Sequence, residues 1–326
     1  MDVSIIIATR NRASALIRTL RALTKLTIPF GIRYEILIVD NGSSDTTKEA
    51  VFYQQIYNPN IRYIYEPLPG KSRALNRGID LSSGKIILLT DDDVAPQENW
   101  ISAMCDPIFI GLADAVSGNV ELANHLMRPW MSERHRSLLA STEWMRSSRR
   151  QSLVGANMAF SRNVLNTVPL FDFELGPGGL GYADDSLFAL QLKAAGLRIF
   201  NAVDSTVIHH FDRLRLKREE WISAARKHGA SHAYVGHHWE HWSTHLLPFR
   251  LRRARSRLIS FKKSLNYRLT EDGCSLDEID CIYDYSLRYH HLIFSKESKL
   301  YKYHGLVKLN ISSNHDNSSR LSHRKA

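Results

Sequence analysis

The first hundred residues alternate short apolar runs, rich in β-branched side chains, with segments of helical hydrophobic spacing. Such alternation is typical of βαβ units, in which parallel strands are joined by helices that cross the sheet. We therefore predict an α/β fold with a mostly parallel sheet. Four strands are expected at 3–8, 34–39, 61–65 and 85–89, with helices from about residue 14, at 47–57 and at 74–81.

The pattern is less regular beyond residue 100. The expected elements there are strands at 113–120 and 207–210 and helices at 184–195 and 219–234. The polar, basic segment 121–150 is expected to form a flap. The remainder of the chain predicts a helical appendage, with a polar end after about residue 314 that we expect to be disordered.

The composition excludes several classes of protein. With 326 residues, 44% hydrophobic and 23% charged, the chain can bury a large core and is neither disordered nor collagen-like. Its longest apolar runs have strand length, so no membrane-spanning helix is expected. Asp2 stands where a secretory signal would carry basic residues. Cys105, Cys274 and Cys281 fit neither zinc nor redox spacings, which predicts a cytoplasmic protein with free thiols.

The net charge of +10 is concentrated at the end of the chain. Residues 245–326 contain 16 Lys and Arg against 8 Asp and Glu, and residues 250–268 contain eight basic residues and no acidic one. Apolar residues interleave with these cations, as in helices that lie on anionic membranes. The alternatives are a helix packed on the main domain or a face paired with acidic neighbours. No nucleic acid partner is expected, because no nucleic-acid-binding motif is present.

Three aspartates, Asp91, Asp92 and Asp93, follow the fourth strand directly. Adjacent carboxylates repel one another unless a cation neutralises them or water solvates them. Hard oxygen ligands suit Mg²⁺ or Mn²⁺. Ligands of open α/β sheets bind outside the carboxyl ends of the strands, so this position favours a metal over a solvated acidic turn.

A second acidic group, Asp184 and Asp185, follows a glycine-rich loop and begins a predicted helix. The helix dipole favours carboxylates there, so capping is the simpler interpretation for one of them. A general base that deprotonates a hydroxyl is the alternative. His209 and His210 end a predicted strand, where either could be a metal ligand, a phosphate contact or a structural residue.

Two nucleotide-binding motifs are excluded. The segment 70–72 reads Gly-Lys-Ser, but a P-loop needs a glycine where Tyr65 stands. The turn at 9–12 contains no glycine, whereas a dinucleotide-binding turn requires three. Lys71 and Arg73 can still supply positive charge near a diphosphate.

Six segments, taken in order, resemble the family 2 glycosyltransferases, which are nucleotide-sugar-dependent enzymes with a GT-A fold. They are residues 3–12, 35–45, 70–78, 89–93, 155–160 and 184–196. The resemblance implies a GT-A catalytic domain over 1–235. A basic helical extension at 236–313 and a disordered tail at 314–326 would follow it.

The resemblance also implies residue roles. Contacts with the nucleotide sugar are implied for Thr9, Arg10, Asn11, Arg12, Asp40, Asn41, Glu66, Lys71, Arg73, Asp91, Asp92 and Asn157. Ligands of Mn²⁺ or Mg²⁺ are implied at Asp93, at Asp91 and at His209 or His210. Asp185 is implied as the base. Asp184 stands where the family usually has glutamate, which leaves open which aspartate reaches the acceptor.

The implied reaction is inverting, metal-dependent transfer of one sugar from a nucleoside-diphosphate sugar to a hydroxyl of a glycan or lipid-linked saccharide. Family frequency favours UDP, with GDP and dTDP open. The Gln-x-x-Arg-Trp signature of processive synthases is absent, which implies one sugar per encounter. The expected location is the cytoplasm, at the inner face of the cell membrane. The alternatives are a sugar nucleotidyltransferase and an inactive nucleotide-binding protein of the same fold.

Overall fold

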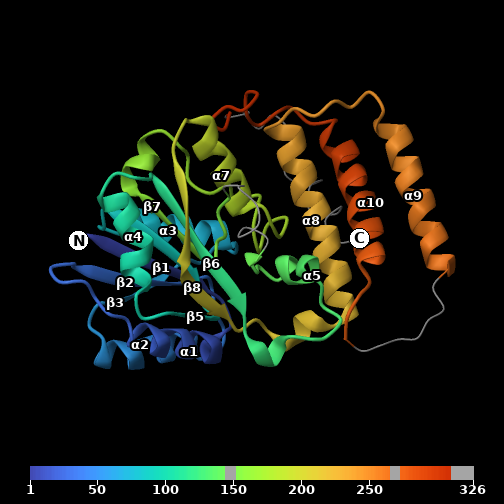
Figure 1. The fold of residues 1–326 in the computed structure, drawn as a ribbon. Helices are drawn as coiled ribbons and strands as arrows, with labels where there is room; N and C mark the ends of the chain where they lie inside the picture. The colour runs from blue at the N-terminus through green and yellow to red at the C-terminus, as the bar shows by residue number, and fades with distance from the viewer. Residues whose placement is uncertain (144–151, 265–271, 310–326) are drawn as a thin grey trace.

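The computed structural model describes residues 1–143, 152–264 and 272–309, and its strands form one curled sheet flanked by helices (Figure 1). The strands are β1 (Val3–Thr9), β2 (Tyr34–Asp40), β3 (Ile61–Tyr65), β4 (Ile86–Asp91), β5 (Val94–Pro96), β6 (Ala115–Leu122), β7 (Asn157–Ser161) and β8 (Ile199–His209). The helices are α1 (Ala13–Leu23), α2 (Thr47–Tyr57), α3 (Lys71–Leu81), α4 (Trp100–Phe109), α5 (Glu133–Leu138), α7 (Asp184–Ala194), α8 (Arg218–His238), α9 (Leu247–Ser264) and α10 (Leu276–Phe294).

The sheet confirms the predicted α/β class. Its strand order is β3-β2-β1-β4-β7-β6-β8-β5, and β1 pairs in parallel with both β2 and β4 while β2 pairs in parallel with β3. The second half is mixed, because β7 runs antiparallel to β4 and β6, and β5 runs antiparallel to β8. The carboxyl ends of β1, β2 and β4 therefore meet at one edge.

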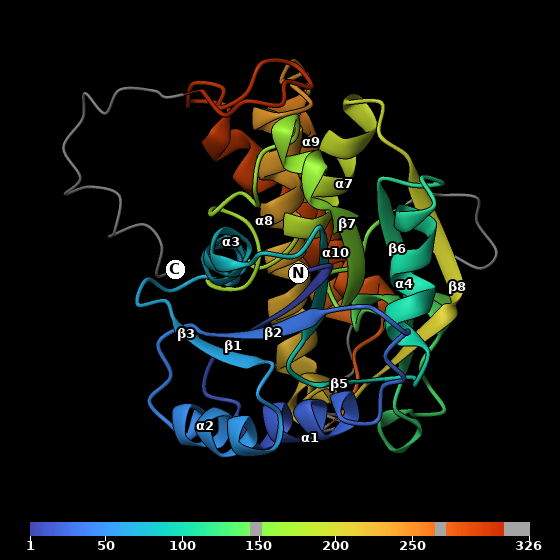
Figure 2. The ribbon, with the colours of Figure 1, turned by 90° about the vertical axis from the view of Figure 1, so that its left-hand side faces the viewer.

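The central strand β1 is apolar on both sides because helices cover both faces of the sheet. Ile5 and Ile7 pack with Leu16 of α1, whereas Ile6 packs with Leu75 of α3. Figure 2 shows α1 and α2 below β1–β3 and α3 above them. This alternation fixes the register of β1, since a one-residue slip would exchange its two faces.

Three helices form a layer beside the sheet. Figure 1 shows α8, α10 and α9 side by side, and α10 packs against both of the others. Trp221 and Ala225 of α8 pack with Ile279 and Ile282 of α10 in one buried cluster. Helix α8 runs through residue 235, where the boundary between domains was predicted, so that division stays a prediction.

A buried carboxylate ties the end of the described chain to the loop before α7. Asp172 is 7% exposed and accepts hydrogen bonds from the hydroxyls of Tyr234 (2.7 Å) and Tyr301 (2.6 Å). Lys308 Nζ lies 2.6 Å from its other oxygen. The adjacent Phe171 exchanges backbone hydrogen bonds with the side chain of Asn76 on α3. Residues 301–308 thus hold the loop that leads into the glycine-rich segment.

Several sequence-based expectations concern the rest of the chain. The three cysteines are free, as predicted, and all three are buried. Within the described ranges, no helix is long and apolar enough to cross a membrane. Part of the predicted flap (144–150), part of the basic segment (265–268) and the predicted tail (314–326) lie outside the described residues.

Candidate active site

The acidic triplet lies at the end of β4, beside the end of β1. Asp92 and Asp93 are each 4% exposed. The Arg12 guanidinium reaches both carboxylates, at 3.2 Å from Asp92 Oδ1 and 2.5 Å from Asp93 Oδ2. The Thr9 hydroxyl donates to Asp92 Oδ2 at 2.7 Å. The turn after β1 therefore supplies the cation that lets two adjacent carboxylates be buried.

The two buried carboxylates differ in proton affinity. Burial raises the pKa of Asp92 to about 6, against the opposing charge of Arg12. Burial also acts on Asp93, but its contacts with His209 and Arg12 outweigh it and hold its pKa well below the usual range. Asp93 therefore carries a charge at neutral pH.

His209, the last residue of β8, faces Asp93. Its Nε2 lies 3.3 Å from Asp93 Oδ1, which is buried and has no hydrogen-bond partner. Its Nδ1 lies 2.9 Å from the carbonyl oxygen of Leu139. Because a carbonyl only accepts, Nδ1 carries a proton and donates it to Leu139, which turns Nε2 toward the carboxylate. When Nε2 carries no proton, it could share a cation with Asp93 Oδ1.

The neighbouring histidine lies differently. The ring of His210 stacks on His125, with centroids 5.7 Å apart, and only its backbone nitrogen contacts Asp93, at the carbonyl oxygen. Geometry thus favours His209 as the ligand. Among residues 1–143, 152–264 and 272–309, no group of three or more His, Cys, Asp or Glu could hold a metal. Asp93 and His209 offer two ligands, and Mg²⁺-type ions fill other positions with waters and substrate phosphates.

Lys71 links the triplet to the acidic pair. It is the first residue of α3, and its Nζ forms a salt bridge with Asp91 Oδ1. Burial lowers the pKa of Lys71, but the charges of Asp91 and Asp184 outweigh burial and raise the pKa above its usual value. One lysine therefore stays charged between carboxylates from β4 and α7.

The glycine-rich loop brings the acidic pair to α3. Gly176 has φ +74°, and a Cβ there would lie 2.8 Å from Asp184 Oδ2. A Cβ on Gly178 would lie 2.7 Å from Gly70 Cα, at the start of α3. The backbone nitrogen of Lys71 donates to the carbonyl of Pro177 at 2.7 Å. Only glycines allow this close approach of loop, helix and carboxylate.

The acidic pair occupies the first turn of α7, but neither aspartate is its cap. The N-cap is Ala183, in the left-handed region with φ 69°, and no side chain caps the helix. Asp185 Oδ2 accepts from the backbone nitrogen of Gly155 at 2.9 Å, and its Oδ1 accepts from the Ser186 hydroxyl at 3.2 Å. Burial and the charge of Asp185 raise the pKa of Asp184 to about 6. Neither aspartate is therefore the N-cap residue, although both lie in the first turn, where the helix dipole favours carboxylates.

Three further predicted donor residues lie on adjoining loops at the same edge. Asn11 has φ 54°, a conformation that asparagine tolerates, and its Oδ1 accepts from the backbone nitrogen of Ser44 at 2.7 Å. Asp40, at the end of β2, accepts from the backbone nitrogen of Ser43 and the Tyr63 hydroxyl, each at 2.8 Å. Arg10 is exposed on the same turn as Asn11.

The remaining two charged residues of the predicted donor set lie at the rim. Glu66 accepts from the backbone nitrogen of Leu68 at 2.9 Å. The Arg73 guanidinium lies over the ring of Phe173, 4.3 Å from its centroid. Both side chains remain partly exposed.

Two predicted donor contacts need correction. Asn157 is fully buried in β7, where its carboxamide donates to the carbonyls of Asn119 and Ser205 and accepts from the Trp100 indole. Its amide atoms are all engaged, so the side chain has no group left for a donor.

Asn41 is 5% exposed, and its side chain holds the loop before α3. It donates to the carbonyls of Glu66 (3.1 Å) and Leu68 (2.7 Å) and accepts from the nitrogen of Gly70 (2.7 Å). It therefore positions neighbours rather than contacting a ligand itself.

Sequence reasoning missed two backbone groups of the site. The carbonyl of Leu139 sets the tautomer of His209, and the carbonyl of Pro177 fixes the start of α3. Any residue carries a carbonyl, so side-chain identity gives no signal for the first. Pro177 lies in the glycine-rich loop, which the sequence did mark.

The profile of the family described as "Glycosyl transferase family 2" matches residues 4–168, which is more than half of the chain. This chain belongs to glycosyltransferase family 2. Glycosyltransferase AglE of Haloferax volcanii is 38% identical over 120 residues, covering 36% of this chain and 39% of that protein. Glycosyltransferase GlyG of Streptococcus pneumoniae is 27% identical over 118 residues, covering 36% and 38%. The chain thus matches about two fifths of the length of these relatives.

Solved structures of glycosyltransferases share the fold over most of the chain. The mannosyltransferase PcManGT of Pyrobaculum calidifontis, solved in complex with GDP-Man and Mn²⁺, superposes with a TM-score of 0.50 at 19% identity. It covers 91% of this chain and 76% of that one. This likeness bears on the fold alone and confirms the predicted GT-A fold of this family 2 member.

Proposed function

We propose that this chain is a metal-dependent, inverting glycosyltransferase that transfers one sugar from a nucleoside-diphosphate sugar to a hydroxyl of a glycan or lipid-linked saccharide. Residues 1–235 would form the catalytic domain and 236–313 the basic extension. The observation that carries the proposal is the Asp93–His209 pair, in which a buried carboxylate oxygen lies 3.3 Å from an imidazole nitrogen. It stands at the strand ends, where α/β sheets bind nucleotides.

The residues present fit a divalent metal. Asp93 and His209 would hold Mn²⁺ or Mg²⁺, which would stabilise the negative charge that develops on the leaving diphosphate. Lys71 stays protonated close by and supports the same charge. The Nδ1 contact of His209 with Leu139 fixes the ring for ligation.

Asp185 is proposed as the general base. The Gly155 nitrogen and Ser186 hydroxyl orient its carboxylate. It would take the proton of the acceptor hydroxyl while that oxygen attacks the anomeric carbon from the face opposite the diphosphate. Attack from the opposite face inverts the anomeric carbon. Asp184, with its pKa raised to about 6, is the alternative base, because a pKa near the working pH favours proton transfer.

A thermal-shift panel tests this proposal directly. UDP, GDP, dTDP, CMP and ATP are each added with and without Mn²⁺ to wild type and Asp93→Asn, because a ligand of the native state raises the unfolding temperature. We expect a Mn²⁺-dependent shift with one nucleoside diphosphate, absent in the variant. That base then names the donor for an assay of diphosphate release. Consumption of a triphosphate would favour a nucleotidyltransferase, and binding without turnover an inactive protein.

An anionic membrane surface is proposed as a further partner, through α9. This helix has no acidic residue, and its exposed face carries cations together with exposed Phe249 (64%) and Ile259 (45%). The exposed cations are Arg250, Arg252, Arg253, Arg255, Arg257 and Lys262, of which Arg257 lies 4.0 Å from Asp284 of α10. The opposite face, with buried Ala254, packs on α10. Such a helix binds through cation attraction to anionic lipid and insertion of its apolar side chains.

Vesicle co-sedimentation tests this surface. Wild type should sediment with vesicles that contain anionic lipid, less so at high salt, and not with neutral vesicles. Phe249→Ser together with Arg253→Gln should weaken binding, whereas Arg77→Gln, an exposed cation on α3, should not. Equal sedimentation with both kinds of vesicle, or with all variants, would contradict a role for α9.

A further inference from the structure

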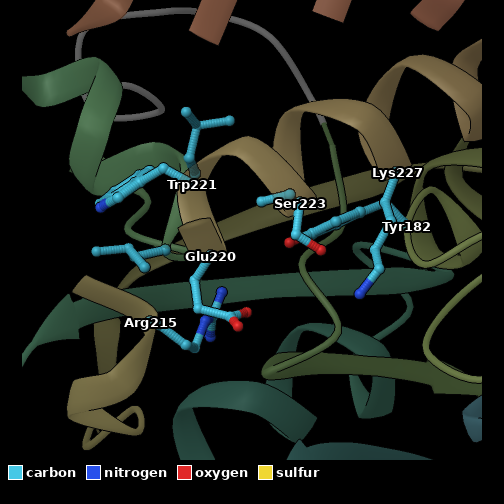
Figure 3. A pocket seen from close by; sticks show the side chains of 9 residues that line it. Tyr182, Arg215, Glu220, Trp221, Ser223 and Lys227 are labelled. Carbon is cyan, nitrogen blue, oxygen red and sulfur yellow. The ribbon is translucent and has the colours of Figure 1, made fainter. Parts of the chain in front are cut away.

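A small cavity lies between helix α8, the end of α5 and the loop before α7. Its volume is about 50 Å³, enough for a few water molecules or one small polar group rather than a whole saccharide. Figure 3 shows Lys227 and Tyr182 on one side and Trp221 and Arg215 on the other. Glu220 also lines it. Nothing in the proposed mechanism uses this cavity.

The position of the cavity follows from its walls. Leu139 lines it, and the carbonyl of Leu139 holds His209 beside Asp93. Tyr182 lines it as well, two residues before the acidic pair. The cavity therefore adjoins the elements that carry both the proposed metal ligands and the proposed base.

Helix α8 supports the same placement. His228 stacks on Tyr182 with centroids 3.6 Å apart, directly after the cavity residue Lys227. His232, one helical turn further, feels the charge of Asp185. The Tyr182 backbone nitrogen also donates to the Ser231 hydroxyl at 3.2 Å, so the loop before the acidic pair packs on α8 beside the cavity.

The chemistry of the lining selects an anion. Arg215 contacts the Tyr182 hydroxyl and lies over the ring of Phe211. In the part of the chain that the structure describes, neither Arg215 nor Lys227 forms a salt bridge. Glu220 is an exposed carboxylate, so the lining holds two cations against one anion.

We propose that this cavity is an acceptor subsite that binds the carboxylate or phosphate substituent of an acidic saccharide, with Arg215 and Lys227 as its cations. The inference rests on the proposed function and names its acceptor class. The bound substituent would orient the acceptor so that one of its hydroxyls reaches Asp185. Glu220 would oppose binding of the anion.

Binding of inorganic phosphate tests the site without any turnover. Equilibrium dialysis compares wild type with Arg215→Gln/Lys227→Met and with Arg226→Gln, a matched exposed cation on the same helix outside the lining. We expect the double variant to bind phosphate roughly tenfold or more weakly and Arg226→Gln to bind like wild type. Glu220→Gln should bind more tightly, which keeps the test valid if the double variant fails to fold. Equal binding by all four proteins would overturn the site.

Transfer assays then show whether the subsite prefers a carboxylate or a phosphate. They also test the subsite separately from the proposed function. Hydrolysis of the donor without acceptor reports the proposed function alone. With acceptor, we compare a neutral hexose, a hexuronic acid and a hexose 6-phosphate. The double variant should lower the ratio of acidic-acceptor transfer to donor hydrolysis about tenfold or more, mainly through KM. Donor hydrolysis with no preference for acidic acceptors would overturn the subsite and leave the transferase standing. Phosphate binding with neither donor hydrolysis nor transfer to any of the three acceptors would overturn the proposed function and leave only an anion-binding site.

Discussion

Asp93, after β4, faces Arg12 and His209, whereas Asp184, on the first turn of α7, shares Lys71 with Asp91 and Asp185. The pKa values of these two carboxylates shift in opposite directions. That of Asp93 is held below its usual range, whereas that of Asp184 is raised to about 6. Both carboxylates lie in poorly solvated surroundings. The contacts that offset burial therefore decide the charge of each carboxylate, because Asp184 shares one lysine with two other aspartates.

The largest effect is expected from a change to the acidic pair, Asp184 and Asp185. Asp185→Asn should lower kcat about 10²–10⁴-fold, because the amide cannot accept the acceptor proton. Asp184→Asn is the matched control and should cost less. Binding of the donor nucleotide, followed by thermal shift, should persist in both variants. A larger loss in Asp184→Asn would reverse the assignment of the base.

The second largest effect is expected from a change to Asp93, the other carboxylate of the comparison. Asp93→Asn should lower kcat roughly 10²–10³-fold and abolish the response to Mn²⁺, since the remaining amide is a poor ligand. His209→Gln should act in the same direction, and His210→Gln, the neighbouring control, should keep the Mn²⁺ response. Turnover is measured as diphosphate release over a Mn²⁺ series. An equal loss in the two histidine variants would contradict the distinction between them.

A smaller effect is expected from a change to Lys71, the cation that Asp184 shares with Asp91 and Asp185. The charge of Lys71 lowers the pKa of Asp184, so Lys71→Met should raise that pKa above about 6. The pair then takes up its proton at higher pH, and if transfer needs the ionised pair, activity is lost earlier as the pH falls. The acidic limb of the kcat/KM profile should move up by about one pH unit. An unmoved limb in an active variant would show that Asp184 does not govern it.

The smallest effect on catalysis is expected from a change to Asp172, a buried carboxylate outside the comparison. Asp172→Asn should lower the free energy of unfolding by about 1–3 kcal/mol through loss of charge-assisted bonds. Lys308→Met should act similarly, and the exposed Lys302→Met should be neutral. Urea unfolding measures this. A catalytic loss much larger than the loss of stability would show that Asp172 acts on the site directly.

The sequence was most informative where hydrophobic periodicity and the ends of strands determine where a residue lies. The first four strands and the acidic residues that follow them were predictable, because alternating burial and turn residues are local signals. The glycine-rich loop also stood out, although its partner at the start of α3 did not.

Contacts between distant segments were not predictable. Nothing local distinguishes His209 from His210, because the choice depends on which way β8 turns its last side chain. Likewise, Asn157 carries a polar amide at a position that the structure buries completely. Arg12 was predicted to contact the donor, but its guanidinium forms salt bridges with Asp92 and Asp93. Residue type alone does not reveal which polar groups find partners in the fold.

The anchor at Asp172 has a consequence for the order in which a new chain matures. Lys308 is made 136 residues after Asp172, a delay on the order of ten seconds at ordinary rates of synthesis. During that interval the loop beside the acidic pair lacks the hydrogen bonds from residues 301 and 308. The strand ends can assemble early, but the glycine-rich loop is fastened only when the last described residues have emerged from the ribosome. Completion of the site is therefore a late event in the life of the nascent chain.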